Sequence, residues 1–144
     1  MKYKIYLDNC CFNRPYDDQS YLTIHLESQA KLFVQKEILQ GNLELVWSYI
    51  LDYENSVNPY DERKNAIANW RSIAAVDIDM SDEIVELGKS VMIKGIKKKD
   101  ALHIACAIKA ECDYFLTTDN KLLNKKFSEI VLINPIDFIR KLGV

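Results

Sequence analysis

The chain alternates short apolar runs with longer segments in which apolar residues recur every three or four positions. Short apolar runs are typical of buried strands, and the longer period is typical of amphipathic helices. The pattern predicts strands at 3–7, 43–47, 75–78, 114–117 and 130–133. It predicts helices that begin at 20, 48, 61, 81, 100, 120 and 135. Strands that alternate with helices predict an α/β fold, a three-layer α/β/α sandwich around a central parallel sheet of four or five strands.

The buried faces of the helices follow from the same spacing. In the long helix that begins at 20 and ends near Gly41, the positions expected to face inward are Leu22, Leu26, Ala30, Phe33 and Ile38. In the helix that begins at 48, they are Ile50, Tyr53 and Val57. The stretch 13–18 contains Pro15 and is expected to be a polar loop. The helix from 100 is apolar nearly all round, so we expect it to be central and buried.

The length of 144 residues suits one domain, 1–144, with its own core. No apolar stretch approaches the roughly 20 residues that a membrane span needs, and the first residues lack the apolar core of a signal peptide. We therefore expect a cytoplasmic protein that does not contact a membrane and whose four cysteines are reduced. Without a CxxC pair, we interpret these cysteines as small core residues. The four glycines are isolated, which excludes phosphate-cradling loops and dinucleotide fingerprints.

Four acids stand at positions that the predicted fold brings together. Asp8 follows the first strand and Asp119 follows the strand at 114–117, while Glu54 and Asp100 lie on two of the helices. The carboxyl ends of parallel strands share one edge, where ligands bind. Four carboxylates at one edge would repel one another unless a cation neutralised them. Oxygen ligands favour Mg²⁺ or Mn²⁺, so the pattern indicates a metal-dependent nuclease.

Each acid also has a simpler interpretation. Asp8 is suited to a turn after a strand, and both Asp100 and Asp119 are suited to capping the helices that follow them. Glu54 competes with Asp52 for a place in the site, because the two residues point to different sides of one helix. Glu54 borders the expected buried stripe, whereas Asp52 lies about 160° away at roughly 3.6 residues per turn. We therefore expect Glu54 to reach the site and Asp52 to face water.

Other polar residues are expected to support the acids. Asn9 adds a polar group beside Asp8, Thr117 places a hydroxyl at a strand end, and His103 lies one turn after Asp100. We expect His103 to support the site rather than to bind the metal. The net charge of −2 does not indicate a nucleic-acid binder, yet lysines cluster beside two of the acids. The residues expected to contact RNA phosphates are Arg14, Lys98, Lys99 and Lys121, and Tyr16 is placed to stack on an unpaired base.

Four motifs resemble those of the PIN domains, and among them the VapC-like toxins of toxin–antitoxin pairs. The resemblance rests on Tyr6-Leu7-Asp8-Asn9, on Ser48 followed by Glu54, on Lys99-Asp100-Ala101-Leu102-His103-Ile104-Ala105, and on Thr117-Thr118-Asp119. It covers essentially the whole chain. It implies a Mg²⁺- or Mn²⁺-dependent endoribonuclease in which Asp8, Glu54, Asp100 and Asp119 are catalytic and bind the metal, with Thr117 supporting them. Some relatives carry a further acid after the fourth motif, where this chain has Asn120 and Lys121, so the number of metal ions stays open.

The resemblance also implies a cognate antitoxin as partner, an RNA substrate and a homodimer. An apparent excess of apolar residues, Val34, Leu39 and Ile50, adds a reason to expect an interface. Two other functions remain open: a PIN domain that binds RNA or a partner without catalysis, and a phosphatase with its site at a sheet edge. The haloacid-dehalogenase pattern needs a second aspartate two residues after the first, and here that position is Cys10.

Overall fold

Five parallel strands form one sheet in the order β3-β2-β1-β4-β5 in the computed structural model, which describes residues 2–144. The strands are β1 (Tyr3–Leu7), β2 (Leu43–Ser48), β3 (Val76–Ile78), β4 (Tyr114–Leu116) and β5 (Val131–Ile133). Every neighbouring pair is parallel. The predicted α/β fold is therefore confirmed, with five strands in its sheet.

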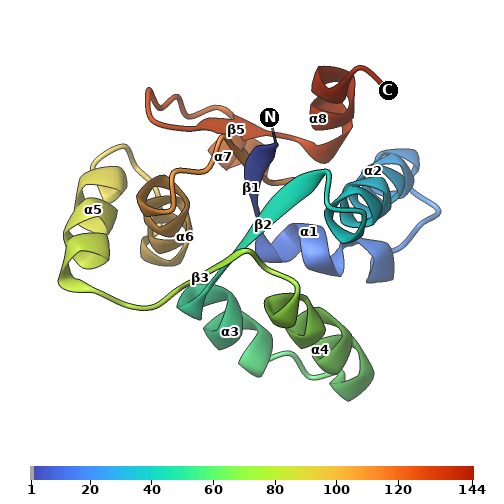
Figure 1. Cartoon of the computed structure of the whole chain (residues 1–144), viewed down its shortest axis with the longest axis horizontal. Helices are drawn as coiled ribbons and strands as arrows, with labels where there is room; N and C mark the ends of the chain where they lie inside the picture. Colours follow the sequence, from blue (N-terminus) through green and yellow to red (C-terminus); the bar gives the residue numbers. More distant parts are fainter. Residues whose placement is uncertain (1) are drawn as a thin grey trace.

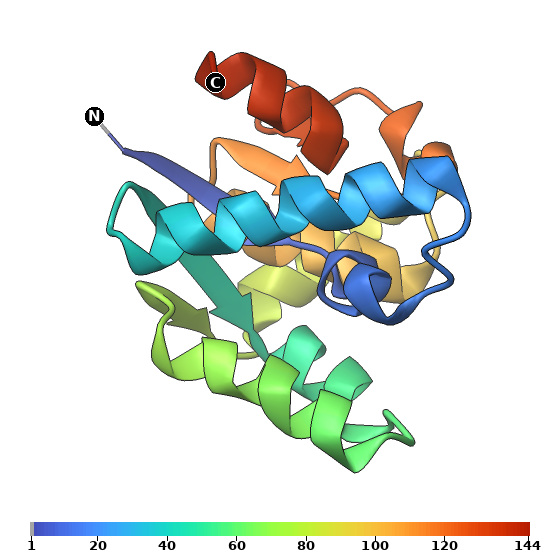
Figure 2. The same ribbon diagram turned by 90° about the vertical axis from the view of Figure 1, so that its right-hand side faces the viewer.

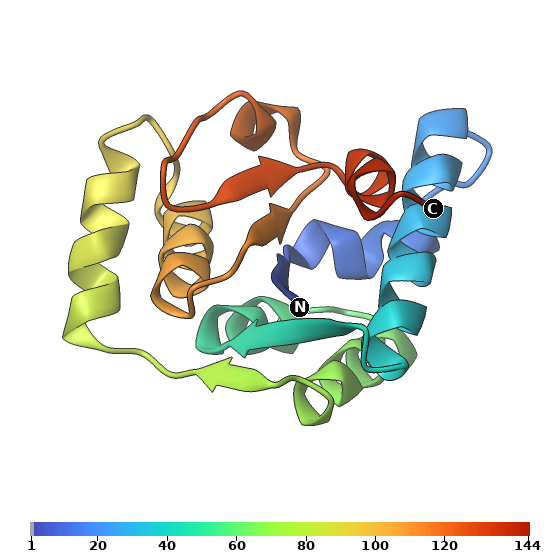
Figure 3. The same cartoon turned by 45° about the horizontal axis from the view of Figure 1, so that its top comes forward.

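Helices cover both faces of the sheet (Figure 1). The helices are α1 (Asn9–Asn13), α2 (Leu22–Leu39), α3 (Tyr49–Ser56), α4 (Asp61–Ala68), α5 (Asp82–Met92), α6 (Lys98–Lys109), α7 (Asn120–Leu123) and α8 (Pro135–Leu142), with short 3₁₀ turns η1 (Arg14–Tyr16) and η2 (Asn69–Ser72). Helices α5 and α6 lie on one side, and α1, α2 and α8 lie on the other (Figure 3). Helix α2 runs across its face of the sheet, with α8 packed beside it (Figure 2).

The core is centred on β1, which lies in the middle of the sheet. Ile5, Tyr6 and Leu7 are fully buried, as are Trp47 of β2 and Phe115 of β4. A central strand of a covered parallel sheet is buried on both faces, which explains why β1 is apolar without alternation. Within residues 2–144, no helix is both long and apolar enough to cross a membrane.

The predicted loop at 13–18 is partly helical. The Asp8 side chain accepts a hydrogen bond from the backbone N–H of Asn9 and so caps α1, which the sequence pattern did not predict. Pro15 then lies in the first turn of η1, where its fixed φ suits helical backbone. Only residues 17–21 remain irregular. The consequence is that Arg14 and Tyr16 are held on structured backbone close to Asp8.

The predicted buried stripe of α2 is wrong in its first half. Leu22 and Leu26 are exposed, whereas Glu27 and Lys31 are buried. This face of α2 packs against η1 and α8, where polar partners replace apolar ones. Contacts with neighbouring elements therefore override the apolar spacing in this part of the helix.

Most of the apolar residues that were expected to mark an interface are not on the surface. Val34 and Ile50 are 0% and 6% exposed, so both belong to the core. Only Leu39, which is 62% exposed at the end of α2, remains on the surface. The expected homodimer consequently keeps no support from Val34 and Ile50.

Candidate functional site at the carboxyl edge of the sheet

The four predicted acids lie at the carboxyl edge of the sheet, on four different elements. Asp8 comes directly after β1, and Asp119 follows the end of β4 by three residues; these two strands are neighbours in the sheet. Glu54 lies on α3, and Asp100 lies in the first turn of α6. Helix α6 begins at Lys98, and no side chain caps its N-terminus. The simpler interpretation of Asp100 as an N-cap is therefore wrong.

Asp8 is held rigidly in the buried part of this edge. Its side chain is buried and accepts hydrogen bonds from the hydroxyl of Thr117 at 2.8 Å and from the backbone N–H of Asn9 at 2.8 Å. The Thr117 hydroxyl in turn accepts from the backbone N–H of Asp119 at 3.1 Å. Thr117 therefore links the carboxylate of Asp8 to the segment that carries Asp119.

The electrostatics of the edge connect all four acids. Burial raises the pKa of Asp8 well above its ordinary value; Cys10 and, to a smaller extent, Asp100 raise it further, whereas His103 and the hydrogen bond from Thr117 lower it. Burial also raises the pKa of Asp100, and the nearby carboxylates of Asp119 and Glu54 add to that rise. Carboxylates that raise one another's pKa lie close enough to repel. Asp119 also caps α7 by accepting from the backbone N–H of Lys121 at 2.9 Å, so its capping role coexists with its place at this edge.

A buried chain of hydrogen bonds ends at Glu54. The ring of His103 is fully buried; its Nε2 contacts the Glu54 carboxylate and its Nδ1 lies 2.5 Å from the hydroxyl of Tyr6. The Tyr6 hydroxyl lies 2.6 Å from that of Ser48, which accepts from the backbone N–H of Leu51 at 3.3 Å. Sequence reasoning did not single out Tyr6, because a tyrosine inside an apolar strand looks like an ordinary core residue.

The direction of these hydrogen bonds follows from the carboxylate at their end. Ionised Glu54 can only accept, so Nε2 of His103 carries the hydrogen, and Nδ1 of a neutral ring then accepts from Tyr6. Burial raises the pKa of Tyr6 well above its ordinary value, so its hydroxyl stays protonated and can donate. The chain therefore orients the Glu54 carboxylate from behind.

Asp52 lies on the other side of α3. It accepts from the indole Nε1 of Trp47 at 2.8 Å and lies 3.5 Å from Nη1 of Arg71. The Asp52 side chain is 40% exposed, compared with 18% for Glu54. The expected buried stripe of α3 is nevertheless wrong at Tyr53 and Val57, which are 59% and 67% exposed, although Ile50 is buried as predicted. Glu54 thus faces the other acids although the apolar spacing used to orient it does not describe the buried face.

The donor set fits a divalent metal ion. Asp8, Glu54 and His103 each offer one ligand atom, and these atoms all lie within 4.8 Å of one another, whereas Asp100 and Asp119 do not belong to this group. Both nitrogens of His103 already have partners, which favours the carboxylates as the ligands. Beside them, Oδ1 of Asn9 is buried and has no hydrogen-bond partner among residues 2–144. An amide oxygen next to carboxylates completes a set of oxygen donors suited to a hard cation.

Basic residues line a cavity next to two of the acids. Asp100 and Asp119 border a cavity of about 350 Å³ together with Lys97, Lys121 and Lys125. Lys121 was predicted from the sequence as an RNA contact, whereas Lys97 and Lys125 were not. We refer to this space as the basic cavity. It offers positive charge beside the carboxylates, which suits a phosphate group.

The other predicted RNA contacts are more dispersed. Lys98 borders a separate apolar cavity between α5 and α6, and the Lys99 ammonium lies 5.7 Å from the ring of Tyr53. Arg14 is bound by two carboxylates, with Nε 3.1 Å from Glu27 and Nη1 3.1 Å from Asp17. The basic cavity therefore contains Lys121 alone of the four predicted residues.

Cys10 is a site residue that sequence reasoning missed. Three of the four cysteines are buried, in agreement with the predicted core role, but Cys10 is half-buried. Its sulfur lies 3.5 Å from a carboxylate oxygen of Asp8 and 3.5 Å from the hydroxyl of Thr117, and it accepts from the backbone N–H of Thr118. Hydrogen bonds, chiefly with Cys11 and Thr118, lower the pKa of Cys10 to about 6. Its position two residues after Asp8 was the only available signal.

Comparison with known proteins supports the fold through structure and not through sequence. No family model matches the chain, and no curated protein sequence matches it. Among solved structures, a chain of the crystal structure of VapBC2 from Rickettsia felis bound to a DNA fragment from their promoter matches with a TM-score of 0.58. The two are 19% identical, and the match covers 91% of this chain and 98% of that chain. This likeness shows the fold, a PIN-like three-layer α/β/α arrangement.

Proposed function

We propose that the protein is a metal-dependent endoribonuclease that hydrolyses phosphodiester bonds of RNA. The observation that carries this proposal is the convergence of Asp8, Glu54, Asp100 and Asp119 at one edge of the sheet. Burial and neighbouring carboxylates raise the pKa of Asp8 and Asp100, so the fold holds these charges together against their repulsion. Groups with perturbed pKa values that gather in this way are candidates for function.

The four carboxylates would hold Mg²⁺ or Mn²⁺, cations that favour such oxygen donors. When bound, such an ion neutralises charge on the phosphate and makes water a stronger nucleophile. Thr117 and the backbone N–H of Asn9 fix the orientation of Asp8. His103 orients Glu54, which then accepts a proton from the attacking water or completes the set of ligands.

Positive charge beside these acids would hold the phosphates that flank the cleaved bond. Lys121, Lys97 and Lys125 are the best placed, because they border the basic cavity with Asp100 and Asp119. Lys98, Lys99 and Arg14 remain proposed RNA contacts outside the basic cavity. Tyr16 is 45% exposed, but the Arg63 guanidinium lies 4.6 Å from its ring centre and already covers one face. Only the other face of Tyr16 is then available for stacking on a base.

We also propose that the protein is a cytoplasmic toxin that forms a homodimer and is bound by an antitoxin. The support is the likeness to a chain in the crystal structure of VapBC2 from Rickettsia felis bound to a DNA fragment from their promoter. Light scattering of the purified chain at micromolar concentration tests the dimer, and a monomer is the contrary result. Co-expression with the product of an adjoining small reading frame tests the antitoxin, which should suppress cleavage.

A panel of substrates separates the proposed nuclease from its alternatives. The purified protein is incubated with single-stranded RNA, single-stranded DNA of the same sequence and p-nitrophenyl phosphate, each with Mn²⁺ and with EDTA. We expect internal cleavage of RNA that requires Mn²⁺ and no release of p-nitrophenol. Release of p-nitrophenol without RNA cleavage would make the protein a phosphatase. RNA binding with no cleavage under Mg²⁺ or Mn²⁺ would make it a binding module.

A further inference from the structure

A second cavity, of about 410 Å³, lies on the other side of the segment that carries Asp119. Thr118 and Asn120, the two neighbours of Asp119, form part of its wall, together with Arg14. Ile24 and Ile136 contribute apolar walls. We call this space the Arg14 cavity. Because Asp119 itself borders the basic cavity, residues 118–120 separate two cavities on either side of one proposed metal ligand.

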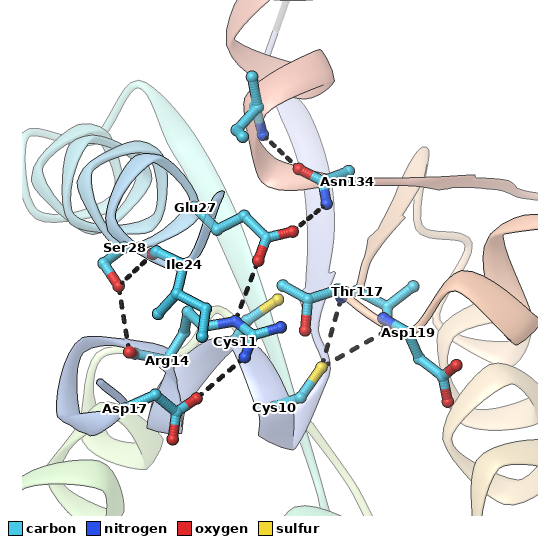
Figure 4. A network of polar contacts seen from close by, with 12 residues as sticks. Cys10, Cys11, Arg14, Asp17, Ile24, Glu27, Ser28, Thr117, Asp119 and Asn134 are labelled. Carbon is cyan, nitrogen blue, oxygen red and sulfur yellow. Dashed lines mark hydrogen bonds and ion pairs between the residues drawn. The ribbon is translucent and has the colours of Figure 1, made fainter. Parts of the chain in front are cut away.

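A network of buried charged groups supports this cavity. Glu27 is 4% exposed; one of its carboxylate oxygens lies 3.1 Å from Nε of Arg14, and the other accepts from the amide of Asn134 at 2.5 Å. Asp17 binds Nη1 of Arg14 at 3.1 Å. Figure 4 shows the guanidinium held between these two carboxylates, with Asn134 beyond Glu27. The plane of the Arg14 side chain is therefore fixed before any ligand arrives.

One nitrogen of Arg14 is left over. Nη1 donates a hydrogen bond to Asp17, and Nε forms an ion pair with Glu27 without the alignment of a hydrogen bond, whereas Nη2 has no partner within residues 2–144 and is joined by no dashed line in Figure 4. Bracing η1, α2 and α8 together accounts for the contacts of Glu27 and Asn134. It requires neither a cavity of this size nor an unused hydrogen-bond donor on a fixed guanidinium. A fixed donor at a cavity wall is suited to recognising an acceptor on a ligand.

We infer that the Arg14 cavity binds the base of a nucleotide next to the cleaved phosphate, and prefers guanine or uracil, which carry a keto oxygen where adenine and cytosine carry an amino group. This inference rests on the proposed function and names what the site recognises. A strand that places a phosphate over Asp119 has its neighbouring nucleotides beside residues 118–120. Pockets of roughly 300 to 1,000 Å³ with apolar walls and a few polar groups suit such ligands.

The preference follows from the donor that Arg14 offers. Its Nη2 donates to a keto oxygen, O6 of guanine or O4 of uracil, whereas adenine and cytosine present an amino group at the same edge. A donor facing an amino group leaves both without a partner. Unpaired bases of single-stranded RNA expose these edges, so the preference requires an unpaired substrate. One hydrogen bond from a charged donor discriminates between bases by roughly tenfold or more in affinity.

The test compares two pyrimidine ligands that differ at this edge. Fluorescein-labelled oligouridylate and oligocytidylate of equal length are titrated with the wild-type protein in EDTA, and binding is followed by anisotropy. EDTA prevents cleavage, and repulsion between the acids and the phosphates weakens the binding of both ligands alike. We expect oligouridylate to bind at least about tenfold more tightly than oligocytidylate.

Two variants and one control test whether the Arg14 cavity determines the ratio of the affinities for oligouridylate and oligocytidylate. Arg14→Lys keeps a cation beside Glu27 but removes the planar donor, and Thr23→Trp fills the cavity from an exposed position on α2. Both should bring the ratio close to one. Arg71→Gln removes another arginine that is bound by two carboxylates, Asp77 and Asp52, and should leave the ratio unchanged.

Equal affinity of the wild type for the two ligands would overturn the inference, as would a preference that survives in both cavity variants. If oligouridylate and oligocytidylate bind with equal affinity and Thr23→Trp does not change that affinity, no base occupies the Arg14 cavity. A protein side chain would then be the occupant instead. The proposed function stands or falls separately. Cleavage with Mn²⁺ but no base preference refutes the inference alone, whereas a uridine preference in a protein that cleaves nothing refutes the nuclease alone.

Discussion

The charged side chains at the two edges of the central sheet have different surroundings. At the amino edge, the backbone N–H of Lys4 donates to the Asp113 carboxylate at 2.8 Å and the Lys4 ammonium donates to the Ala110 carbonyl at 3.1 Å. Both side chains there have hydrogen-bond partners in exposed or partly buried surroundings. At the carboxyl edge, by contrast, burial raises the pKa of both Asp8 and Asp100, and further carboxylates lie nearby.

This difference indicates which edge serves stability and which serves function. Single hydrogen bonds near the surface, like those at the amino edge, contribute only about 0.5–1.5 kcal/mol each to stability. Unpaired carboxylates that raise one another's pKa destabilise the folded chain until a cation binds. A fold that keeps them together is therefore organised for a ligand rather than for its own stability. Substitutions at the two edges should consequently have opposite effects.

The largest difference is expected between Asp100 and Asp113. Asp100→Asn should lower metal-dependent RNA cleavage at least about a hundredfold, because the charge on a metal ligand is worth several kcal/mol in the transition state. Its melting temperature without metal should stay the same or rise, since repulsion is relieved. Asp113→Ala should leave cleavage unchanged and cost about 1 kcal/mol of unfolding free energy. Cleavage rates and thermal melts of both variants measure the effects, and wild-type cleavage by Asp100→Asn would contradict the assignment.

The second comparison uses two acids on one helix. Glu54→Gln should reduce cleavage at least about tenfold, because it weakens both the ligand set and the proposed base. Asp52→Asn should change cleavage little, since Asp52 contacts Trp47 and Arg71 rather than the other acids. Single-turnover rates under Mn²⁺ decide between them. If Asp52→Asn is the more damaging change, the site must be redrawn around Asp52.

A smaller effect on cleavage is expected from Tyr6, which lies behind Glu54 in the chain of hydrogen bonds. Tyr6→Phe removes the hydroxyl that donates to His103 and leaves the ring nitrogen buried without a partner. The cost in unfolding free energy should be about 1–3 kcal/mol, measured by urea denaturation. Cleavage should fall less than with Glu54→Gln, because the carboxylate is retained and only its orientation loosens. Unchanged stability and cleavage would show that the chain of hydrogen bonds does not orient Glu54.

The smallest effect concerns the pH dependence of stability without metal. The pKa of Asp8 in the folded protein is raised above its ordinary value of 3.8, so the folded state binds this proton more tightly than the unfolded state. The contribution of Asp8 therefore favours folding at low pH and is lost as the pH rises through the raised pKa. Asp8→Asn should lack this loss, so its melting temperature should gain on the wild type as the pH increases above 3.8. A constant difference between the two melting curves would contradict the raised pKa.

The strands and the placement of the acids could be predicted from the sequence because both depend on local pattern. Apolar runs mark buried strands, and the residue after a strand must lie at the sheet edge. The buried face of α2 could not be predicted, because Glu27 is buried against Arg14 and Asn134 and Lys31 lies over the ring of Phe12, contacts that the spacing along α2 does not show.

Polar groups inside the core were the second limit of sequence reasoning. Tyr6 and Cys10 resemble ordinary core residues until His103 and Asp8 are placed beside them. The orientation of Glu54 toward the other acids was predicted from a stripe that Tyr53 does not follow. Spacing along one helix shows which residues share a face, but only packing decides which face is buried.

Cleavage of an end-labelled single-stranded RNA, followed through removal and return of the metal, tests the central claim most directly. The wild-type protein is treated with EDTA, then dialysed and supplied with Mn²⁺, beside Asp100→Asn and Asp52→Asn handled in the same way. We predict that cleavage stops in EDTA, returns with Mn²⁺ in the wild type and Asp52→Asn, and stays absent in Asp100→Asn. Cleavage that persists in EDTA, or that returns fully in Asp100→Asn, would contradict a metal-dependent site at the carboxyl edge of the sheet.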